Sequence, residues 1–165
     1  MDQSQPENSE QVFDASPYLK LFIDKDGKWF QNDAEIIHPN VYAIFCKALE
    51  TTPDGGYQVR IGREVCRVEV EDAPFVVQGL SENSDKQLII RLNDGTDEVF
   101  NPEPLFIGED NIPYTEVKNR IFKARFSRPA YYQLAQHITE HNQEFYIDIA
   151  GKRTRIQIEP SRNAD

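Results

Sequence analysis

Residues 39–71 carry the clearest secondary-structure pattern of the chain and have the sequence PNVYAIFCKALETTPDGGYQVRIGREVCRVEVE. In its first part apolar residues recur at helical spacing, at Val41, Ile44, Phe45, Ala48 and Leu49. Pro39 suits the first turn of a helix, where a missing N–H costs nothing, and the turn-forming residues 53–56 end the helix. Apolar and polar residues then alternate on both sides of Gly62-Arg63. The stretch therefore predicts a helix followed by a β-hairpin.

A similar pattern recurs near the C-terminus. Ser127 is the expected N-cap of a helix that opens at Arg128-Pro129 and ends at His141-Asn142. Its apolar stripe is Tyr131, Leu134, Ala135 and Ile138, and alternating strands then flank Gly151-Lys152. We infer a duplicated strand–helix–hairpin unit over residues 28–71 and 122–159. The alternative is coincidence, because many α+β proteins contain a helix and a hairpin more than once.

The remaining segments are predicted to be extended. Turn residues at 24–27 and 93–95 indicate two further hairpins. The sequence therefore predicts an α+β protein of mainly antiparallel strands with two helices, arranged in two small lobes. We expect a disordered acidic tail over residues 1–16, an N-terminal lobe over 17–80, and a C-terminal lobe over 81–165 that holds the central hairpin and the second helix–hairpin.

Charge and composition restrict the partners. The formal net charge is −10, from 28 acidic and 18 basic residues, so nucleic acids and anionic membranes are disfavoured. Residues 1–11 are polar and lack the apolar run of a signal peptide, and no run of eighteen apolar residues occurs. We expect a soluble, cytoplasmic protein in which Cys46 and Cys66 are reduced thiols, with a single disulfide as the alternative.

Catalytic and metal-binding motifs receive little support. Residues 137–141, HITEH, fit the H-x-x-E-H spacing of one class of zinc peptidase. However, the match falls at the end of a predicted helix and few residues follow it, so we interpret it as a polar helix terminus. The run Asp24-Lys25-Asp26-Gly27 is similar to the start of a calcium loop, but Lys28 occupies the position of a third oxygen ligand. We predict no metal, no cofactor and no catalytic residue.

The corner at residues 70–75, VEDAPF, is the strongest candidate for a site. Glu71 and Asp72 end a strand, where carboxylates are well placed to face a cleft and to bind a ligand, or to pair with Arg60, Arg63 or Arg67. The structural alternative is that Asp72 accepts nearby backbone N–H groups and stabilises the turn before Pro74. His38 has the same ambiguity, because it can cap the first helix or line a cleft. The second copy has no such corner after Glu159.

This corner and the preceding residues resemble a bacterial family called domain of unknown function (DUF) 1285. The resemblance rests on Asp26-Gly27-Lys28-Trp29-Phe30, Ile37, Pro39, Phe45, Tyr57, Val59, Glu64, Val68 and residues 70–76. It covers about the first half of the chain. It implies a soluble bacterial protein, and it implies no activity, so no catalytic residue is carried over. It directs attention to Trp29, Glu64, Glu71, Asp72 and Phe75.

Three hypotheses of function follow. The first is a non-enzymatic binding or interaction module for a small ligand or a protein, with a cationic or amine-bearing ligand suiting the corner; its candidate residues are Trp29, His38, Glu64, Glu71, Asp72 and Phe75. The second is a small hydrolase that uses Glu71 or Asp72 as general base, with His38 as a candidate partner. The third is a subunit of a homodimer or larger assembly, with Leu105-Phe106-Ile107 as an exposed apolar patch.

Overall fold

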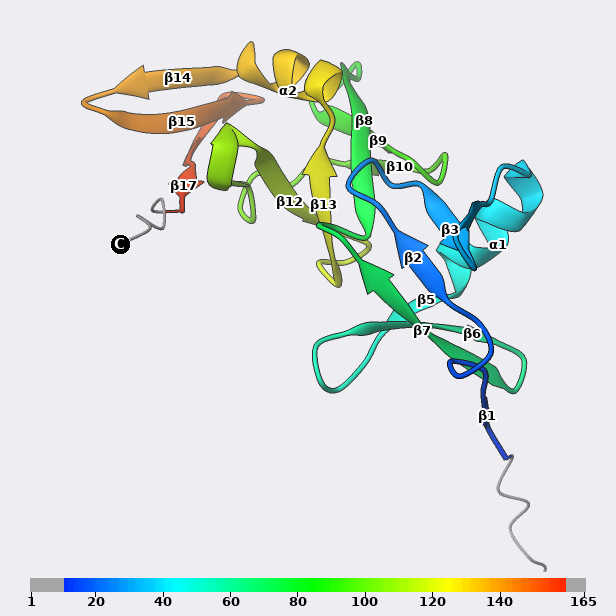
Figure 1. The fold of residues 1–165 in the computed structure, drawn as a ribbon. Helices are drawn as coiled ribbons and strands as arrows, with labels where there is room; N and C mark the ends of the chain where they lie inside the picture. Colours follow the sequence, from blue (N-terminus) through cyan, green and yellow to red (C-terminus); the bar gives the residue numbers. More distant parts are fainter. Residues whose placement is uncertain (1–10, 160–165) are drawn as a thin grey trace, which may run out of the picture. The chain divides into compact units, whose positions relative to one another are not determined.

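The computed structural model describes residues 11–159, and its chain divides into two compact units (Figure 1). Unit 1 holds the described residues up to Phe22 together with Trp29–Glu69. Unit 2 holds Ile23–Lys28 and the described residues from Val70 onward. The lobes expected over 17–80 and 81–165 stay predictions, as does the tail expected over 1–16, of which residues 1–10 lie outside the described part of the chain. No helix among the described residues is both long and apolar enough to cross a membrane.

Unit 1 is built on a seven-stranded sheet in the order β4-β3-β2-β7-β6-β5, with β1 parallel to β7. The strands are β1 Phe13–Asp14, β2 Leu21–Ile23, β3 Trp29–Gln31, β4 Ala34–Glu35, β5 Leu49–Thr51, β6 Tyr57–Ile61 and β7 Glu64–Val70. The predicted hairpin is confirmed, with Val59 opposite Cys66. Cys46 and Cys66 are both free thiols and both buried.

The first helix, α1, spans Pro39–Ala48 and connects β4 to β5. It starts where the proline predicts, and its N-cap is His38. The helix ends one residue before the predicted stripe does, because Leu49 adopts an extended conformation and pairs with Val59. The predicted hairpin is therefore part of a three-stranded antiparallel meander, β5-β6-β7.

Unit 2 contains a second seven-stranded sheet in the order β10-β9-β8-β13-β12-β11-β17. Its strands are β8 Phe75–Glu82, β9 Leu88–Leu92, β10 Asp97–Val99, β11 Phe106–Ile107, β12 Pro113–Val117, β13 Phe122–Phe126 and β17 Gln157–Ile158. The predicted hairpin around residues 93–95 is confirmed, since β9 and β10 are antiparallel. The pairs β13–β8 and β11–β17 are parallel, which joins segments far apart in sequence. A short 3₁₀ helix, η1, spans Glu109–Asn111.

The second helix, α2, spans Arg128–Ala135 and packs against β8 (Figure 1). Its N-cap is Ser127, as predicted. The prediction that this helix continues to His141 is wrong. Ile138–His141 forms strand β14, which pairs with β15, Glu144–Ile149, and β15 pairs with β16, Lys152–Arg155. Cross-strand pairing thus overrides the helical periodicity of this short segment.

The H-x-x-E-H match therefore lies mostly on a strand. A strand rises about 3.3 Å per residue, more than twice the rise of a helix, so His137 and His141 lack the one-turn spacing that a zinc helix requires. Among residues 11–159, no group of three or more His, Cys, Asp or Glu side chains is placed to hold a metal ion. Asn142 and Gln143, both with positive φ, form the tight turn between β14 and β15.

Each unit contains a helix followed by a three-stranded antiparallel meander, yet the strand order around the two helices differs. In unit 1 the last strand of the meander, β7, continues the sheet through β2. In unit 2 the meander β14-β15-β16 is a separate three-stranded sheet, and β13, which precedes α2, lies between β8 and β12. The α+β class is confirmed, whereas the duplication of a whole lobe is not.

Candidate functional site

Glu71 stabilises the turn at residues 24–27. Its backbone N–H donates to the carbonyl of Ile23 at 2.9 Å, and its Oε2 accepts from the backbone N–H of Lys25 at 2.7 Å. Within the turn, Oδ1 of Asp24 accepts from the N–H groups of Asp26 and Lys28. These bonds make the run a hydrogen-bonded turn, as the sequence predicts. One oxygen of Glu71 therefore has a structural role.

Asp72 lies at the centre of a polar cluster made by two strands, β12 and β13, and the β7–β8 corner. Its Oδ2 accepts from the hydroxyl of Tyr114 at 2.7 Å and from Nη1 of Arg125 at 2.9 Å. Tyr114 and Arg125 are directly opposite each other on β12 and β13. Nζ of Lys123 lies 3.9 Å from Oδ1 of Asp72 and over the ring of Tyr114. We call these four residues the Asp72 cluster.

The protonation states of the cluster suit binding. Burial, helped by the hydrogen bond to Asp72, raises the pKa of Tyr114 to about 12. Burial opposes the charge of Arg125, but the hydrogen bond and the charge of Asp72 outweigh it, so the pKa of Arg125 is raised. At neutral pH Tyr114 is thus a neutral donor and Arg125 a permanent cation. The expected pairing of the corner with Arg60, Arg63 or Arg67 is replaced, for Asp72, by pairing with Arg125.

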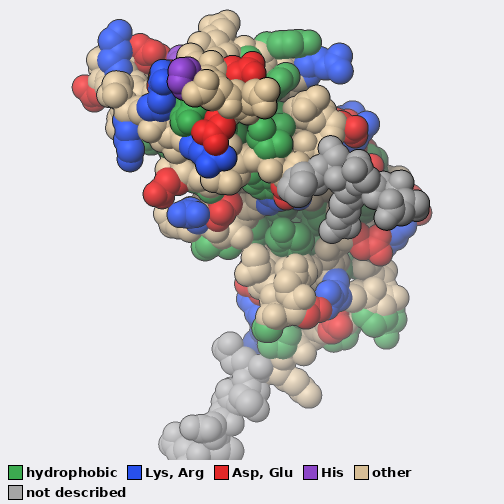
Figure 2. All heavy atoms as spheres, turned by 90° about the vertical axis from the view of Figure 1, so that its left-hand side faces the viewer, with side chains coloured by type: hydrophobic (Ala, Val, Ile, Leu, Met, Phe, Trp, Pro, Cys, Tyr) green, Lys and Arg blue, Asp and Glu red, His purple; other side chains and the backbone are tan. Residues whose placement is uncertain are grey.

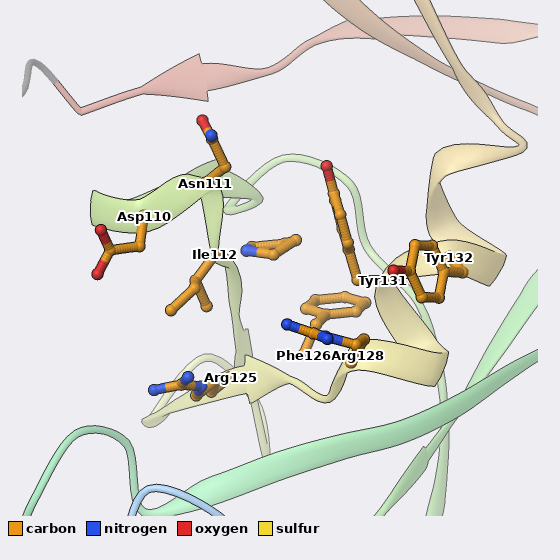
Figure 3. A pocket seen from close by; sticks show the side chains of 9 residues that line it. Asp110, Asn111, Ile112, Arg125, Phe126, Arg128, Tyr131 and Tyr132 are labelled. Atoms are coloured by element: carbon orange, nitrogen blue, oxygen red, sulfur yellow. The ribbon is translucent and has the colours of Figure 1, made fainter.

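Arg125 borders a hollow of about 430 Å³ where β13 meets α2, which we call the β13–α2 hollow (Figure 3). Its lining residues come from η1, β12, β13 and α2: Asp110, Asn111, Ile112, Pro113, Arg125, Phe126, Arg128, Tyr131 and Tyr132. Figure 3 shows the side chain of Arg128 extending from the start of α2 into this space, with Ile112 across from it. A second hollow, of about 410 Å³, shares Arg125, Phe126 and Arg128 with the first and adds Lys25.

Arg128 differs from Arg125 in its partners. Arg125 is half-buried and held by Asp72. Arg128 is exposed, and among residues 11–159 no carboxylate lies within ion-pair distance of its guanidinium. On the face shown in Figure 2, acidic and basic side chains are interspersed instead of forming one large patch. The β13–α2 hollow is therefore a local site with one guanidinium held by Asp72, one guanidinium without an ion-pair partner among the described residues, and the carboxylate of Asp110 in its lining.

The other residues predicted for the site have mainly structural surroundings. Trp29, His38 and Glu64 belong to unit 1. Trp29 is buried and stacks on Phe45 at 5.6 Å, and Nδ1 of His38 accepts from the N–H of Asn40 at 3.2 Å. Glu64 is exposed at the start of β7. Phe75 is buried in unit 2, where its ring packs on Phe122 at 5.3 Å.

The apolar stretch Leu105-Phe106-Ile107 is not the exposed patch expected from the sequence. Leu105 is fully buried, and Phe106 is half-buried with its ring stacked on Tyr114 at 5.2 Å. The proline-rich loop thus packs into unit 2. Four residues of the cluster and hollow were not among those predicted for the site: Tyr114, Arg125, Arg128 and Tyr131. A usable signal was the run 125–132, RFSRPAYY, which places two arginines and two tyrosines around a helix start.

No protein-family model and no curated protein matches the chain. Two solved structures do. One is a DUF1285 family protein from Silicibacter pomeroyi, with a TM-score of 0.69 and 21% identity over 84% of this chain and 80% of that one. The other is a DUF1285 family protein from Shewanella baltica, with a TM-score of 0.60 and 22% identity over 73% of this chain and 94% of that one. The chain thus has the fold of DUF1285 family proteins, which supports at the level of structure the resemblance found in its sequence.

Proposed function

We propose that the protein is a non-enzymatic binding module and that the β13–α2 hollow binds a small organic anion. The observation that carries this proposal is the pair of arginines at the hollow. Arg125 is held in place by Asp72, and Arg128 has no carboxylate partner among the described residues. Guanidinium groups bind carboxylates and phosphates through paired charge-assisted hydrogen bonds.

This ligand class replaces the cationic ligand expected from the sequence. The carboxylate of Asp72 already accepts hydrogen bonds from Tyr114 and Arg125, and Lys123 lies 3.9 Å away. A cation would have to displace these partners. In the proposed role Asp72 is a positioning residue that acts on the ligand through Arg125.

Binding also suits the chemistry of the cluster better than hydrolysis does. A general base must be free to accept a proton from water or substrate. One oxygen of Asp72 is engaged by two donors, and one oxygen of Glu71 accepts a backbone N–H. The high pKa of Tyr114 keeps its hydroxyl protonated at neutral pH. Carboxylates held by hydrogen bonds and a protonated hydroxyl suit the binding of a ligand better than the transfer of a proton.

NMR titration of the full chain with acetate and with inorganic phosphate tests the proposal. We expect both anions to shift the backbone amides of residues 125–128. Arg128→Gln should weaken binding by about tenfold or more, since a charge-assisted hydrogen bond contributes on the order of 1.5–3 kcal/mol. The matched control is Arg120→Gln, which removes an exposed arginine outside the hollow. Equal binding by the Arg128 variant and the wild type would refute the proposal.

A further inference from the structure

A smaller, mainly apolar hollow adjoins the β13–α2 hollow. It has a volume of about 190 Å³ and is lined by Ile107, Asn111, Tyr131, Ala135, Ile138, Phe145, Ile156 and Ile158. Asn111 and Tyr131 line both hollows. A ligand that passes these two residues would have one end beside the arginines and the other among aliphatic side chains.

The residues on one side of helix α2 change from charged to apolar along the helix. Arg128, Tyr131 and Ala135 are separated by three and four residues, so they lie on one side of the helix. Arg128 lines the β13–α2 hollow but not the apolar one, Tyr131 lines both, and Ala135 lines the apolar one. From its start to its end, this side of α2 therefore presents a cation, an aromatic ring and a small apolar residue to the two hollows.

The apolar hollow favours an apolar occupant. Six of its eight lining residues are aliphatic or phenyl side chains, and Ile158 is half exposed to solvent. Covering such surface removes it from water, which stabilises the bound state in proportion to the area buried. Asn111 and the hydroxyl of Tyr131 supply the polar groups at the junction.

We propose that the ligand is an amphipathic anion of medium size, a carboxylate head with an unbranched alkyl tail. The head lies at Arg125 and Arg128, and the tail passes Tyr131 into the apolar hollow. This inference rests on the proposed function, because it uses the same arginines for the head. It adds that the second hollow determines which anions bind tightly.

A series of straight-chain carboxylates tests it, measured by calorimetric titration of the full chain with acetate, butanoate, hexanoate, octanoate and decanoate. Each methylene that enters an apolar site contributes about 0.8 kcal/mol, or roughly fourfold in affinity. We expect affinity to rise by about this factor per methylene and to level off once the hollow is filled. Octanol, which has the tail without the charge, should bind at least tenfold more weakly than octanoate.

Two variants at the end of α2 separate the tail from the head. Ala135→Glu places a carboxylate in the apolar hollow, whereas Gln136→Glu adds the same charge at the next residue, outside it. Both residues are exposed, so both variants should fold. We expect Ala135→Glu to reduce octanoate affinity by tenfold or more and acetate affinity by less than threefold. Gln136→Glu should leave both within threefold of wild type.

The outcomes distinguish the two proposals. If acetate and phosphate bind but affinity does not rise with chain length, the inference fails and the proposed function stands. If no anion binds, both fail. Equal octanoate affinity in the Ala135 and Gln136 variants also overturns the inference. So does binding to phosphatidylserine vesicles without binding of monomeric octanoate, because it would make the occupant a membrane surface.

Discussion

Asp72 and Arg125 are 53 residues apart in the sequence, and they share a charge-assisted hydrogen bond of 2.9 Å in unit 2. This bond links the corner that the sequence singles out to the hollow that it does not. Asp72 comes from the turn after β7, and Arg125 from β13, whose parallel pairing with β8 brings the two together. The corner thus stabilises the arginine, and the arginine borders the hollow.

Asp72→Asn should weaken both the fold and anion binding. The amide keeps the size of the side chain but loses the charge that holds Arg125, so we expect a loss of about 1–2 kcal/mol in the free energy of unfolding. Octanoate affinity should fall about threefold to tenfold. Urea unfolding and calorimetric titration measure the two effects. Asp97→Asn, at an exposed ion pair with Arg91, is the control and should cost less than about 0.5 kcal/mol.

Tyr114 should make stability depend on pH in the alkaline range. Its pKa is raised from an ordinary value of 10.0 to about 12, so the unfolded chain loses this proton first as the pH rises. The contribution is complete below pH 10 and is lost between pH 10 and about 12. Burial also raises the pKa of Tyr57, so the test is the difference between wild type and Tyr114→Phe in urea unfolding at several pH values.

The free energy of unfolding of Tyr114→Phe should fall less than that of the wild type between pH 10 and about 12, because the variant has no proton to lose at this position. The exposed residue Tyr132 gives the control, because Tyr132→Phe should follow the wild-type profile. A Tyr114→Phe profile that falls as steeply as the wild type would show that the hydrogen bond to Asp72 does not control this titration.

Trp29 should behave as a core residue. It is 1% exposed, it stacks on Phe45, and within residues 11–159 its Nε1 has no hydrogen-bond partner. Trp29→Phe removes a buried polar group that lacks a partner and keeps an aromatic ring, so we expect a loss below about 1.5 kcal/mol. Trp29→Ala should cost about 3–5 kcal/mol. Octanoate affinity should stay within twofold of wild type for Trp29→Phe. A larger loss would indicate that Trp29 contributes to ligand binding.

His38 should act as a helix cap. Its Nδ1 accepts from the N–H of Asn40, so His38→Ala should cost about 0.5–2 kcal/mol in the free energy of unfolding. His38→Asn retains a capping acceptor and should recover most of the loss. Chemical denaturation of both variants measures this. If alanine and asparagine destabilise the protein equally, or if either changes octanoate affinity, the capping role is wrong.

Local signals in the sequence predicted the starts of both helices and the central hairpins. Pro39, Ser127 and the turn at 93–95 act through their own backbone conformations, so their consequences do not depend on distant residues. The end of α2 was not predictable in this way. Ile138 continues a helical stripe, but the pairing of β14 with β15 determines its conformation.

The candidate site could be predicted only in part. The sequence singles out Asp72 because carboxylates at a strand end are well placed to face a cleft, yet its partners Tyr114 and Arg125 are remote in sequence. Their meeting depends on the strand order β8-β13-β12, which local periodicity does not encode. A positively charged ligand was expected for the same reason, because Arg125 and Lys123, which offset the charge of Asp72, are remote from it in sequence.

A crystal structure of the full chain with octanoate would show whether one ligand occupies both hollows. We expect the carboxylate within hydrogen-bond distance of Arg128 and beside Arg125, and the alkyl chain past Tyr131 against Ala135 and Ile138. Octanoate bound elsewhere, or bound with its carboxylate away from both arginines, would contradict it.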